Sequence, residues 1–264
     1  MELPADHGTQ SVARAVAIWR QIARSARSGL SLAELAAVTG LAKPTLRRIL
    51  VALIREGMVD QDPASRRYFP GPETYVTGML AAPRFGLMRI AQPALIRLAR
   101  ETGDTCFLTV PRGLHAVCLL REEGSHPVRT HALQPGDEHP LGIGAGSLAI
   151  LAAMPDDEIA VLLDQLAPLL TMPRYAAYSP AMLRDAVAET RTRGHALNPG
   201  LIVPGSWGIG VAIRHPLGGI AGALSLAAID RRLMPDRQGE LAALLRAEAS
   251  RAEKDLADLL RRKT

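Results

Sequence analysis

The sequence predicts an α+β protein in which an N-terminal winged helix is joined by a helix to a domain with a mostly antiparallel sheet. Helical apolar spacing with cap residues runs from residue 11 to residue 56, and a short hairpin pattern follows it. Beyond Gly103 the apolar period becomes strand-like, with helical stretches between the strands. Because 264 residues exceed one average domain, two domains of about 80 and 180 residues are expected.

The first predicted helix begins at Ser11, after ten residues (1–10) that we expect to be disordered. The stretch SVARAVAIWRQIARSA has apolar residues at helical spacing, and it predicts the helix against which the next two helices pack. Its expected core residues are Val12, Val16, Trp19 and Ile22.

The second helix begins with a capping box, in which Ser31 and Glu34 each bond a backbone amide that the helix leaves unpaired. Gly40 stands where a helix ends. After a tight turn, Pro44 suits the first turn of a third helix, because an amide hydrogen is dispensable there. Pro44 should also hold Lys43 in an extended conformation.

The third helix separates its side chains onto two faces. An apolar face should point to the core, and it consists of Leu46, Ile49, Leu50 and Leu53. The opposite face carries Thr45, Arg47, Arg48, Val51 and Arg55. A helix fits the DNA major groove and the arginine fork matches guanine, so the candidate DNA-facing residues are Lys43, Thr45, Arg47 and Arg48. The alternative is a solvated charged face, which many amphipathic helices show.

A hairpin pattern after the third helix favours the nucleic-acid interpretation. Met58 and Val59 are strand-like, residues 62–65 carry a type I turn signal, and residues 66–69 return as a strand. This hairpin makes the helix pair a winged helix, and its residues Arg66 and Arg67 should reach backbone phosphate.

The charge is concentrated in the same part of the chain. Residues 1–85 carry 11 Lys and Arg against 7 Asp and Glu, a net +4, whereas residues 86–264 carry 20 against 19, a net +1. A module that binds a polyanion needs such an excess, although +4 is small enough to arise from composition alone.

The second half predicts a sheet flanked by helices. The expected domains are a winged helix at 11–71, a linker helix at 72–87 and a second domain at 88–264. Residues 73–101 are expected to be helical, with interruptions at Pro83 and Pro93. Strands are expected at 105–110, 114–120, 127–133, 208–215 and 220–229, with hairpin turns at 111–113 and 215–219. Helices are expected at 144–153, 155–167, 180–193 and 235–262, which together give an α+β domain.

Cysteine usage and hydropathy indicate a cytoplasmic protein. Cys106 and Cys118 lie in apolar strand-like contexts without a CxxC pattern, which favours two buried thiols over a disulfide. We find no signal peptide, and the long uncharged runs at 139–155 and 194–213 are broken by Gly and Pro, so no membrane span is expected.

The chain resembles the IclR family of bacterial transcriptional regulators from about residue 10 onward. The specific part of the resemblance is SVARAVAIWRQIA followed by GLSLAELAAVTGLAKPTLRRILVALIREGMVDQDPASRRYFPG. The later part matches more loosely through RLARETGDTCFLTV, PGDEHPLGIGAGSLAILAAM, RTRGHALNPG and GGIAGALSLAAIDRRL. The resemblance implies a winged helix joined to a GAF-like domain that binds a small organic acid effector. It also implies dimers, often paired into tetramers, that bind a palindromic operator in double-stranded DNA.

The resemblance also implies an effector pocket on the concave side of the sheet, held partly by backbone amides. Transferred position by position, its residues would be Ala145, Gly146, Asn198, Gly208, Ser225 and Ala227. The sequence departs from the family pattern at Asn198, Gly208 and Ala227, and it has Ser147 and Leu148 where Gly-Lys is usual. These departures make the pocket less polar and favour a larger or more apolar carboxylate than glyoxylate. Amides at 145–146 would hold that carboxylate, since helix starts favour anions.

Two other interpretations stay open at this stage. One is a small-molecule enzyme with an accessory basic domain, but GxSxG and metal-ligand spacings are absent, so no catalytic residue, metal or cofactor is expected. The histidines of the second domain's first half are interpreted as surface or hydrogen-bonded loop residues: His115, His126, His131 and His139. The other is a partner-binding module without an effector, which would have side chains filling the pocket. In that case the glycines of GIGAGS serve only tight turns.

Overall fold

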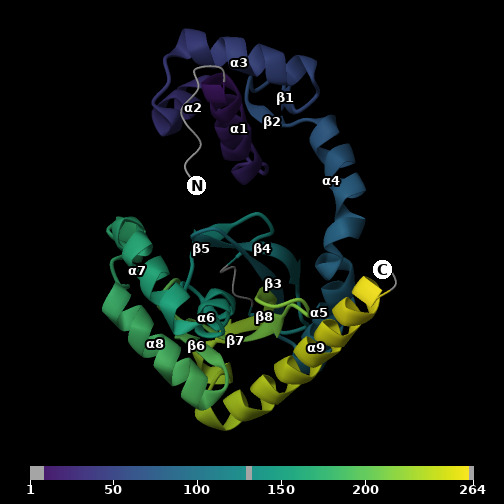
Figure 1. Cartoon of the computed structure of the whole chain (residues 1–264), viewed down its shortest axis with the longest axis vertical. Coiled ribbons are helices and arrows are strands. Elements are labelled where there is room, and N and C mark those ends of the chain that lie inside the picture. Colours follow the sequence, from purple (N-terminus) through teal and green to yellow (C-terminus); the bar gives the residue numbers. More distant parts are fainter. Residues whose placement is uncertain (1–8, 129–132, 262–264) are drawn as a thin grey trace. The chain divides into compact units, whose positions relative to one another are not determined.

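The computed structural model describes residues 9–128 and 133–261, apart from the side chains of residues 83–85. The chain divides into two compact units, residues 1–85 and residues 86–264. Figure 1 shows the elements of both units along the chain.

The first unit is a winged helix. Three helices, α1 (Thr9–Arg24), α2 (Leu32–Thr39) and α3 (Lys43–Arg55), precede a hairpin of β1 (Val59–Gln61) and β2 (Tyr68–Pro70), and α4 (Pro72–Phe85) follows. The predicted capping box of Ser31 and Glu34 is confirmed, and Gly40 ends α2 in the left-handed conformation. The core consists of Ile18, Ile22, Leu35, Leu46, Leu50, Val59 and Tyr68.

Several predictions for this unit were wrong in detail. The first helix begins at Thr9 rather than Ser11, and Val12 and Val16 are 65% and 37% exposed while Ile18 and Ile22 are buried. The predicted core positions Trp19 and Ile22 are confirmed, whereas Val12 and Val16 are not core residues because the buried stripe also passes through Ile18. Trp19 is part-buried and donates from its indole nitrogen to Thr74 Oγ1 at 3.1 Å.

The start of α3 and the strands of the wing also differ from the prediction. Lys43 is the first residue of α3, and the extended residue is the N-cap Ala42, since the N-cap lies outside the helix. Arg66 and Arg67 belong to the loop before β2, because Arg66 has φ of +59° and a strand cannot continue through that conformation. The connector breaks at Gly86, with φ of +63°, instead of at Pro83, and Pro93 lies inside the next helix.

The second unit is built on a six-stranded antiparallel sheet with the order β5-β4-β3-β8-β7-β6. The strands are β3 (Thr105–Arg112), β4 (His115–Glu122), β5 (Glu138–Pro140), β6 (Ala196–Pro199), β7 (Ser206–Arg214) and β8 (Ile220–Ile229). The helices are α5 (Leu87–Thr102), α6 (Ala145–Ala152), α7 (Asp156–Leu170), α8 (Pro180–Arg193) and α9 (Pro235–Arg261), with short 3-10 turns at Pro173–Tyr175 and Asp230–Arg232.

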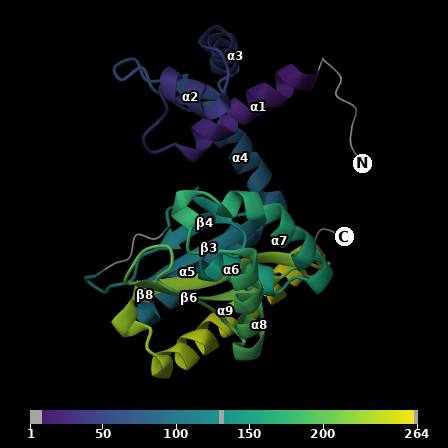
Figure 2. The ribbon, with the colours of Figure 1, turned by 90° about the vertical axis from the view of Figure 1, so that its left-hand side faces the viewer.

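Helices cover both faces of this sheet, as Figures 1 and 2 show. α5 and α9 pack on one face in a core that includes Cys106, Leu108, Leu224 and Leu226. α6, α7 and α8 cover the opposite face in a second core. The sheet is therefore buried on both sides, and α6 is buried along its whole length.

The predicted α+β class is confirmed, with differences at the turns and edges. Pro111 and Arg112 lie in β3, and the turn to β4 falls at Gly113 and Leu114. The strand expected at 127–133 includes residues 129–132, which lie outside the described residues. A strand that was not predicted, β5, forms at 138–140. The edge strand β6, which contains Asn198 and Pro199, was not predicted.

Both cysteines are free and buried, as predicted. Cys106 packs in the core under α5 and α9, whereas Cys118 packs with Phe107 and Ala227 on the other face. Among the described helices, none is long and apolar enough to cross a membrane.

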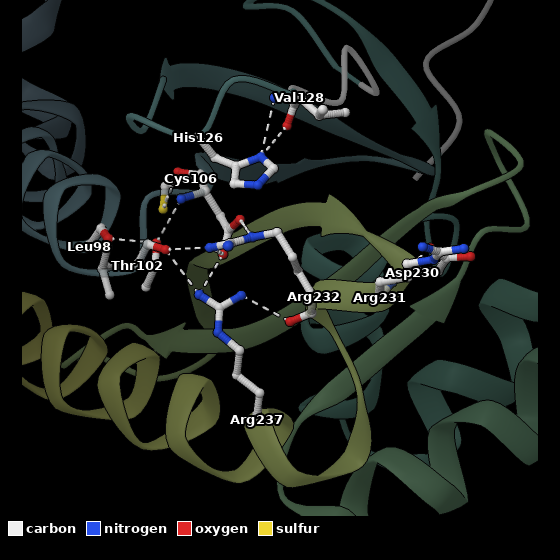
Figure 3. A network of polar contacts seen from close by, with 10 residues as sticks. Leu98, Thr102, Cys106, His126, Val128, Asp230, Arg231, Arg232 and Arg237 are labelled. Atoms are coloured by element: carbon white, nitrogen blue, oxygen red, sulfur yellow. Dashed lines mark hydrogen bonds and ion pairs between the residues drawn. The ribbon is translucent and has the colours of Figure 1, made fainter.

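A buried carboxylate joins the start of the sheet to the start of α9. The Asp104 side chain is 2% exposed and forms ion pairs with Arg232 and Arg237, both at 2.8 Å. Figure 3 shows these two arginines converging on Thr102, whose carbonyl oxygen accepts from both at 2.9 Å. Polar groups on three segments are therefore satisfied together, which fixes the end of α5 against α9.

Candidate DNA interface and ligand cavity

A cationic groove lies between α3 and the β1–β2 hairpin in the first unit. Lys43 and Arg47 line its α3 side, and Arg66 lines its hairpin side together with Gln61 and Ser65. No acidic side chain lines it among the residues that the structure describes. A groove with this lining suits a phosphate backbone or a base edge.

The other two candidate residues of α3 lie outside this groove. At about 100° per residue, Arg48 is about 200° round the helix from the buried Leu46, so it points most directly outward. Thr45 is half-buried on the flank of α3 away from the hairpin. Lys43, Arg47 and Arg48 are all exposed, as is Arg55 at the end of α3, which pairs with Glu56.

The loop between β1 and β2 is held rigid by its own polar groups. Asp62 Oδ1 accepts from both the amide and the hydroxyl of Ser65 at 2.6 Å, and these bonds lower the pKa of the Asp62 carboxyl. Gln61 donates from Nε2 to the Arg66 carbonyl oxygen at 3.0 Å. With its backbone fixed in this way, Arg66 leaves its exposed side chain available to a ligand.

Arg67 has a different role from the one that the sequence predicted. Its Nε donates to the Ser28 carbonyl oxygen at 2.8 Å, and its Nη2 donates to the Gly29 carbonyl oxygen and to both Glu34 carboxylate oxygens. These contacts do not support the expectation that Arg67 binds phosphate, because Nε and Nη2 already donate within the protein. Arg67 ties the hairpin to the start of α2.

A cavity in the second unit lies between the sheet and the N-terminal end of α6. Strand register shows which residues form the sheet side of the cavity, because paired residues and residues two apart on a strand share one face of a sheet. Thr109 pairs with Cys118 on β4 and with Ala223 on β8, while Ser225 pairs with Phe107 and Gly210. This face also carries Gly208 and Ala227, which are directly paired.

The roof of the cavity is the first turn of α6. Gly144 is the N-cap with φ of +87° and no side-chain cap, so the amides of the first turn have no side-chain partner. A Cβ on Gly146 would lie 3.0 Å from Ser225 Oγ and 3.1 Å from Thr109 Oγ1. Glycine at this position therefore lets the first turn of α6 lie close against these two hydroxyls. Thr109 Oγ1 is buried and has no hydrogen-bond partner in the described structure.

The remaining lining is mostly apolar. Asn198 lies on β6, and its Oδ1 accepts from the Leu201 amide at 3.0 Å. Lysine and arginine are absent from the described lining, which includes Asp137 and His139 as its titratable side chains apart from Cys118. The cavity has a volume of about 40 Å³, whereas roughly 10–15 Å³ suffices for one water.

The six residues transferred from the family pattern all line this one cavity: Ala145, Gly146, Asn198, Gly208, Ser225 and Ala227. They come from α6, β6, β7 and β8, which the fold brings together. Sequence reasoning missed Thr109, although alternation along β3 from Phe107 could have indicated it. It also missed His139, which lies on β5 and lines the cavity instead of a surface loop, whereas His131 is outside the described residues.

A winged helix with a cationic groove, followed by a separate α+β unit with an internal cavity, is the architecture of a DNA-binding transcriptional regulator. Comparison with known families assigns both parts. Residues 11–63 match the IclR helix-turn-helix domain, and residues 79–253 match the family described as bacterial transcriptional regulator IclR C-terminal. The chain belongs to the IclR family of transcriptional regulators. Membership decides against the enzyme alternative.

Individual relatives agree with this assignment. The chain is 30% identical over 233 residues to the HTH-type transcriptional regulator BhcR of Paracoccus denitrificans, covering 87% of this chain and 81% of BhcR. An IclR transcriptional regulator of Alicyclobacillus acidocaldarius shares the fold with a TM-score of 0.77 at 22% identity, over 97% and 100% of the two chains. An IclR homologue of Microbacterium hydrocarbonoxydans, solved in complex with 4-hydroxybenzoate, has a TM-score of 0.76 at 19% identity, over 94% and 99%.

Proposed function

We propose that this regulator is controlled by a small organic acid bound in the cavity under α6, and that it binds a palindromic operator as a dimer. One observation carries the effector proposal: the uncapped first turn of α6 lies at Gly146 against the hydroxyls of Ser225 and Thr109, in a cavity whose described lining holds no cationic side chain. A helix N-terminus with such neighbours favours a carboxylate, because backbone amides and hydroxyls donate to it. The solved relative bound to 4-hydroxybenzoate is a precedent for an acid ligand in this fold.

The DNA-facing residues are proposed from the geometry of the first unit. Four residues of α3 would read bases: Lys43 and Arg47 in the groove, the outward-pointing Arg48, and the half-buried Thr45. Arg66 would contact phosphate. One winged helix reads only a few base pairs, so a two-fold dimer on a palindrome would multiply specificity.

An apolar surface on the first unit supports the dimer. Tyr75, Val76, Met79 and Leu80 are spaced to form a stripe on α4, and they are 45–77% exposed. Val12 and Val16 form a second exposed pair on α1. Soluble monomers rarely leave apolar stripes of this kind open to water.

The test begins with fluorescence anisotropy of the full chain on its own upstream DNA and on scrambled DNA, at near-physiological salt. We expect tight binding to the first alone. Arg48→Ala should cost about 1–3 kcal/mol on the operator and relax specificity at one base pair. Equal losses on operator and scrambled DNA would contradict base reading by Arg48.

The second stage screens the effector by thermal unfolding of the full chain. Acetate and benzoate are compared with their neutral amides, acetamide and benzamide, because ligands that bind only the folded state raise its melting temperature. Stabilisation by an acid but not by its amide would support the proposal, and equal effects of acid and amide would refute it. An acid that binds is then added to the operator complex to measure its effect on DNA affinity.

A further inference from the structure

Val51 is an exposed apolar residue on the outward face of α3. Its side chain is 66% exposed. At about 100° per residue, Val51 lies about 140° and Arg48 about 200° round the helix from the buried Leu46. The two side chains therefore flank the direction that points straight away from the core, and Figures 1 and 2 show α3 along one edge of the first unit.

Val51 also continues a line of cations along α3. Lys43, Arg47 and Val51 are each four residues apart, so they follow one another on the same side of the helix. All three line the groove beside the hairpin, where the described residues place no acidic side chain. The apolar surface of Val51 thus adjoins the cations that are proposed to face DNA.

The packing of the first unit does not require valine at this position. Val51 belongs neither to the core, to which α3 contributes Leu46 and Leu50, nor to the partly buried residues packed against it. A β-branched side chain also favours a helix less than the neighbouring arginines do. A single exposed valine needs no explanation on an ordinary surface. On a helix face that meets DNA, however, it lies against base edges and takes part in their selection.

Thymine carries the apolar group on the base edges of the major groove. Its C5 methyl group projects there, whereas the other bases present donors and acceptors. Valine against a donor or acceptor removes that group from water without a hydrogen bond, which is unfavourable. Valine against the methyl group buries apolar surface on both partners, which is favourable. Valine on this face therefore selects thymine.

The rise of the helix indicates where this thymine lies. Val51 is three residues from Arg48 and four from Arg47, which are rises of about 4.5 Å and about 6 Å. Successive base pairs of DNA are about 3.4 Å apart. For a helix lying along the groove, the thymine is then one or two base pairs from the base that either arginine contacts.

Resting on the proposed reading of bases by α3, we infer that Val51 packs against the C5 methyl group of a thymine and makes T·A a requirement at one position of each half-site. Arg47 and Arg48 provide hydrogen bonds to neighbouring bases, and Val51 provides the apolar contact beside them.

The experiment compares the upstream DNA that the chain binds with a copy in which deoxyuridine replaces thymidine throughout. Uracil keeps the O4 acceptor and the base pairing of thymine and lacks only its methyl group. Fluorescence anisotropy of the full chain on both DNAs gives the ratio of the two dissociation constants, which we call the methyl ratio. Loss of one buried methyl contact weakens binding about fourfold, so a dimer on two half-sites should have a methyl ratio of about fifteen.

Variants assign the methyl ratio to Val51. Val51→Ala removes two methyl groups and retains a good helix former, so it should weaken binding to the thymine operator and lower the methyl ratio to about one. Val51→Ile keeps a branched apolar side chain and should keep the ratio. Arg48→Ala should weaken binding to both DNAs while its ratio stays well above one. Val38→Ala, which makes the same change on α2 at a position that is 56% exposed, is the matched control.

Each outcome decides the inference. A methyl ratio well above one that falls to about one in Val51→Ala, and in none of the other variants, supports it. A ratio near one in the unaltered chain, a ratio that survives in Val51→Ala, or one that falls as far in Val38→Ala overturns it, while base reading by Arg48 stands on its own test. Binding to the upstream DNA no tighter than to scrambled DNA refutes the proposed operator recognition, and the inference with it. Circular dichroism of each variant confirms that it is folded before its affinities are compared.

Discussion

Arg67 and Glu34, which lie 33 residues apart in sequence, are joined by a salt bridge of 2.9 Å between Arg67 Nη2 and Glu34 Oε2. The same carboxylate accepts from the Ser31 amide at 2.7 Å and so completes the capping box of α2. One side chain therefore orders both the start of a helix and the base of the wing. The wing is attached to the helix–turn–helix by bonds that its own arginine makes internally.

The salt dependence of DNA binding should distinguish Arg66 from Arg67. Arg66→Ala would remove the proposed phosphate contact, so the slope of log affinity against log salt should fall by about one. Arg67→Ala should weaken binding by loosening the hairpin but leave that slope unchanged, because its guanidinium is bound within the protein. Anisotropy titrations between low and physiological salt measure both slopes. A reduced slope in Arg67→Ala would restore the sequence-based assignment.

Glu34 should make stability depend on acid pH. Hydrogen bonds from Ser31, followed by the bond from Arg67, lower the pKa of the Glu34 carboxyl from 4.5 to about 2. Its contribution is then present above the unfolded pKa and is lost as the pH falls from about 4.5 toward 2. The difference between the wild type and Glu34→Gln in urea unfolding should be largest at pH 6, narrow by pH 3 and vanish only below about pH 2. Glu56→Gln, which alters an exposed pair with Arg55, is the matched control.

Gly146→Ala should abolish effector binding with little loss of stability. The added methyl group would lie 3.0 Å from Ser225 Oγ and 3.1 Å from Thr109 Oγ1, and thus in the space proposed for the carboxylate. We expect affinity for an acid ligand to fall at least tenfold in calorimetry. Gly239→Ala in α9, where the added methyl group meets nothing within 4 Å, is the matched control. Unchanged affinity in Gly146→Ala would remove the α6 N-terminus from the proposed site.

Asp104→Ala should destabilise the second unit strongly. Asp104 is buried and bridges Arg232 and Arg237, so its removal leaves two partly buried cations without their carboxylate. Breaking a buried pair in this way costs about 3–5 kcal/mol. Glu189→Ala disrupts the exposed pair with Arg193 and should cost less than about 1 kcal/mol. Urea unfolding of both variants gives the comparison, and similar losses would contradict the structural role of Asp104.

Leu80→Glu should dissociate the proposed dimer. Leu80 is 77% exposed on the apolar stripe of α4, so a charge there costs little in the monomer but would be buried in the interface. Sedimentation velocity should show a shift from dimer to monomer. Val38→Glu on α2 places the same charge at a position that is 56% exposed outside this stripe. An unchanged dimer in Leu80→Glu would exclude α4 from the interface.

Local signals in the sequence were sufficient for most of the secondary structure. These signals act within a few residues, so they can be recognised without the tertiary structure. They include the capping box at Ser31 and Glu34, the left-handed Gly40 and the apolar spacing of α3. The same holds for α8, where Ser179 caps the start and Gly194 ends the helix. The short strand β6 was not predicted because it is defined by its pairing with β7 and not by a strand pattern in its own four residues.

The sequence by itself determined the winged helix, the α+β class and the family, because helix caps, apolar periods and family motifs are local or linear properties. Only the tertiary structure decided what several side chains do. Arg67 is internal because the hairpin returns to residues 28–34, and Val12 is exposed because packing chooses the Ile18 side of α1. Thr109 and His139 share a cavity with Gly146 because strand order and register place three distant segments on one sheet face. Such proximity depends on pairings between segments far apart in the chain, which no local pattern encodes.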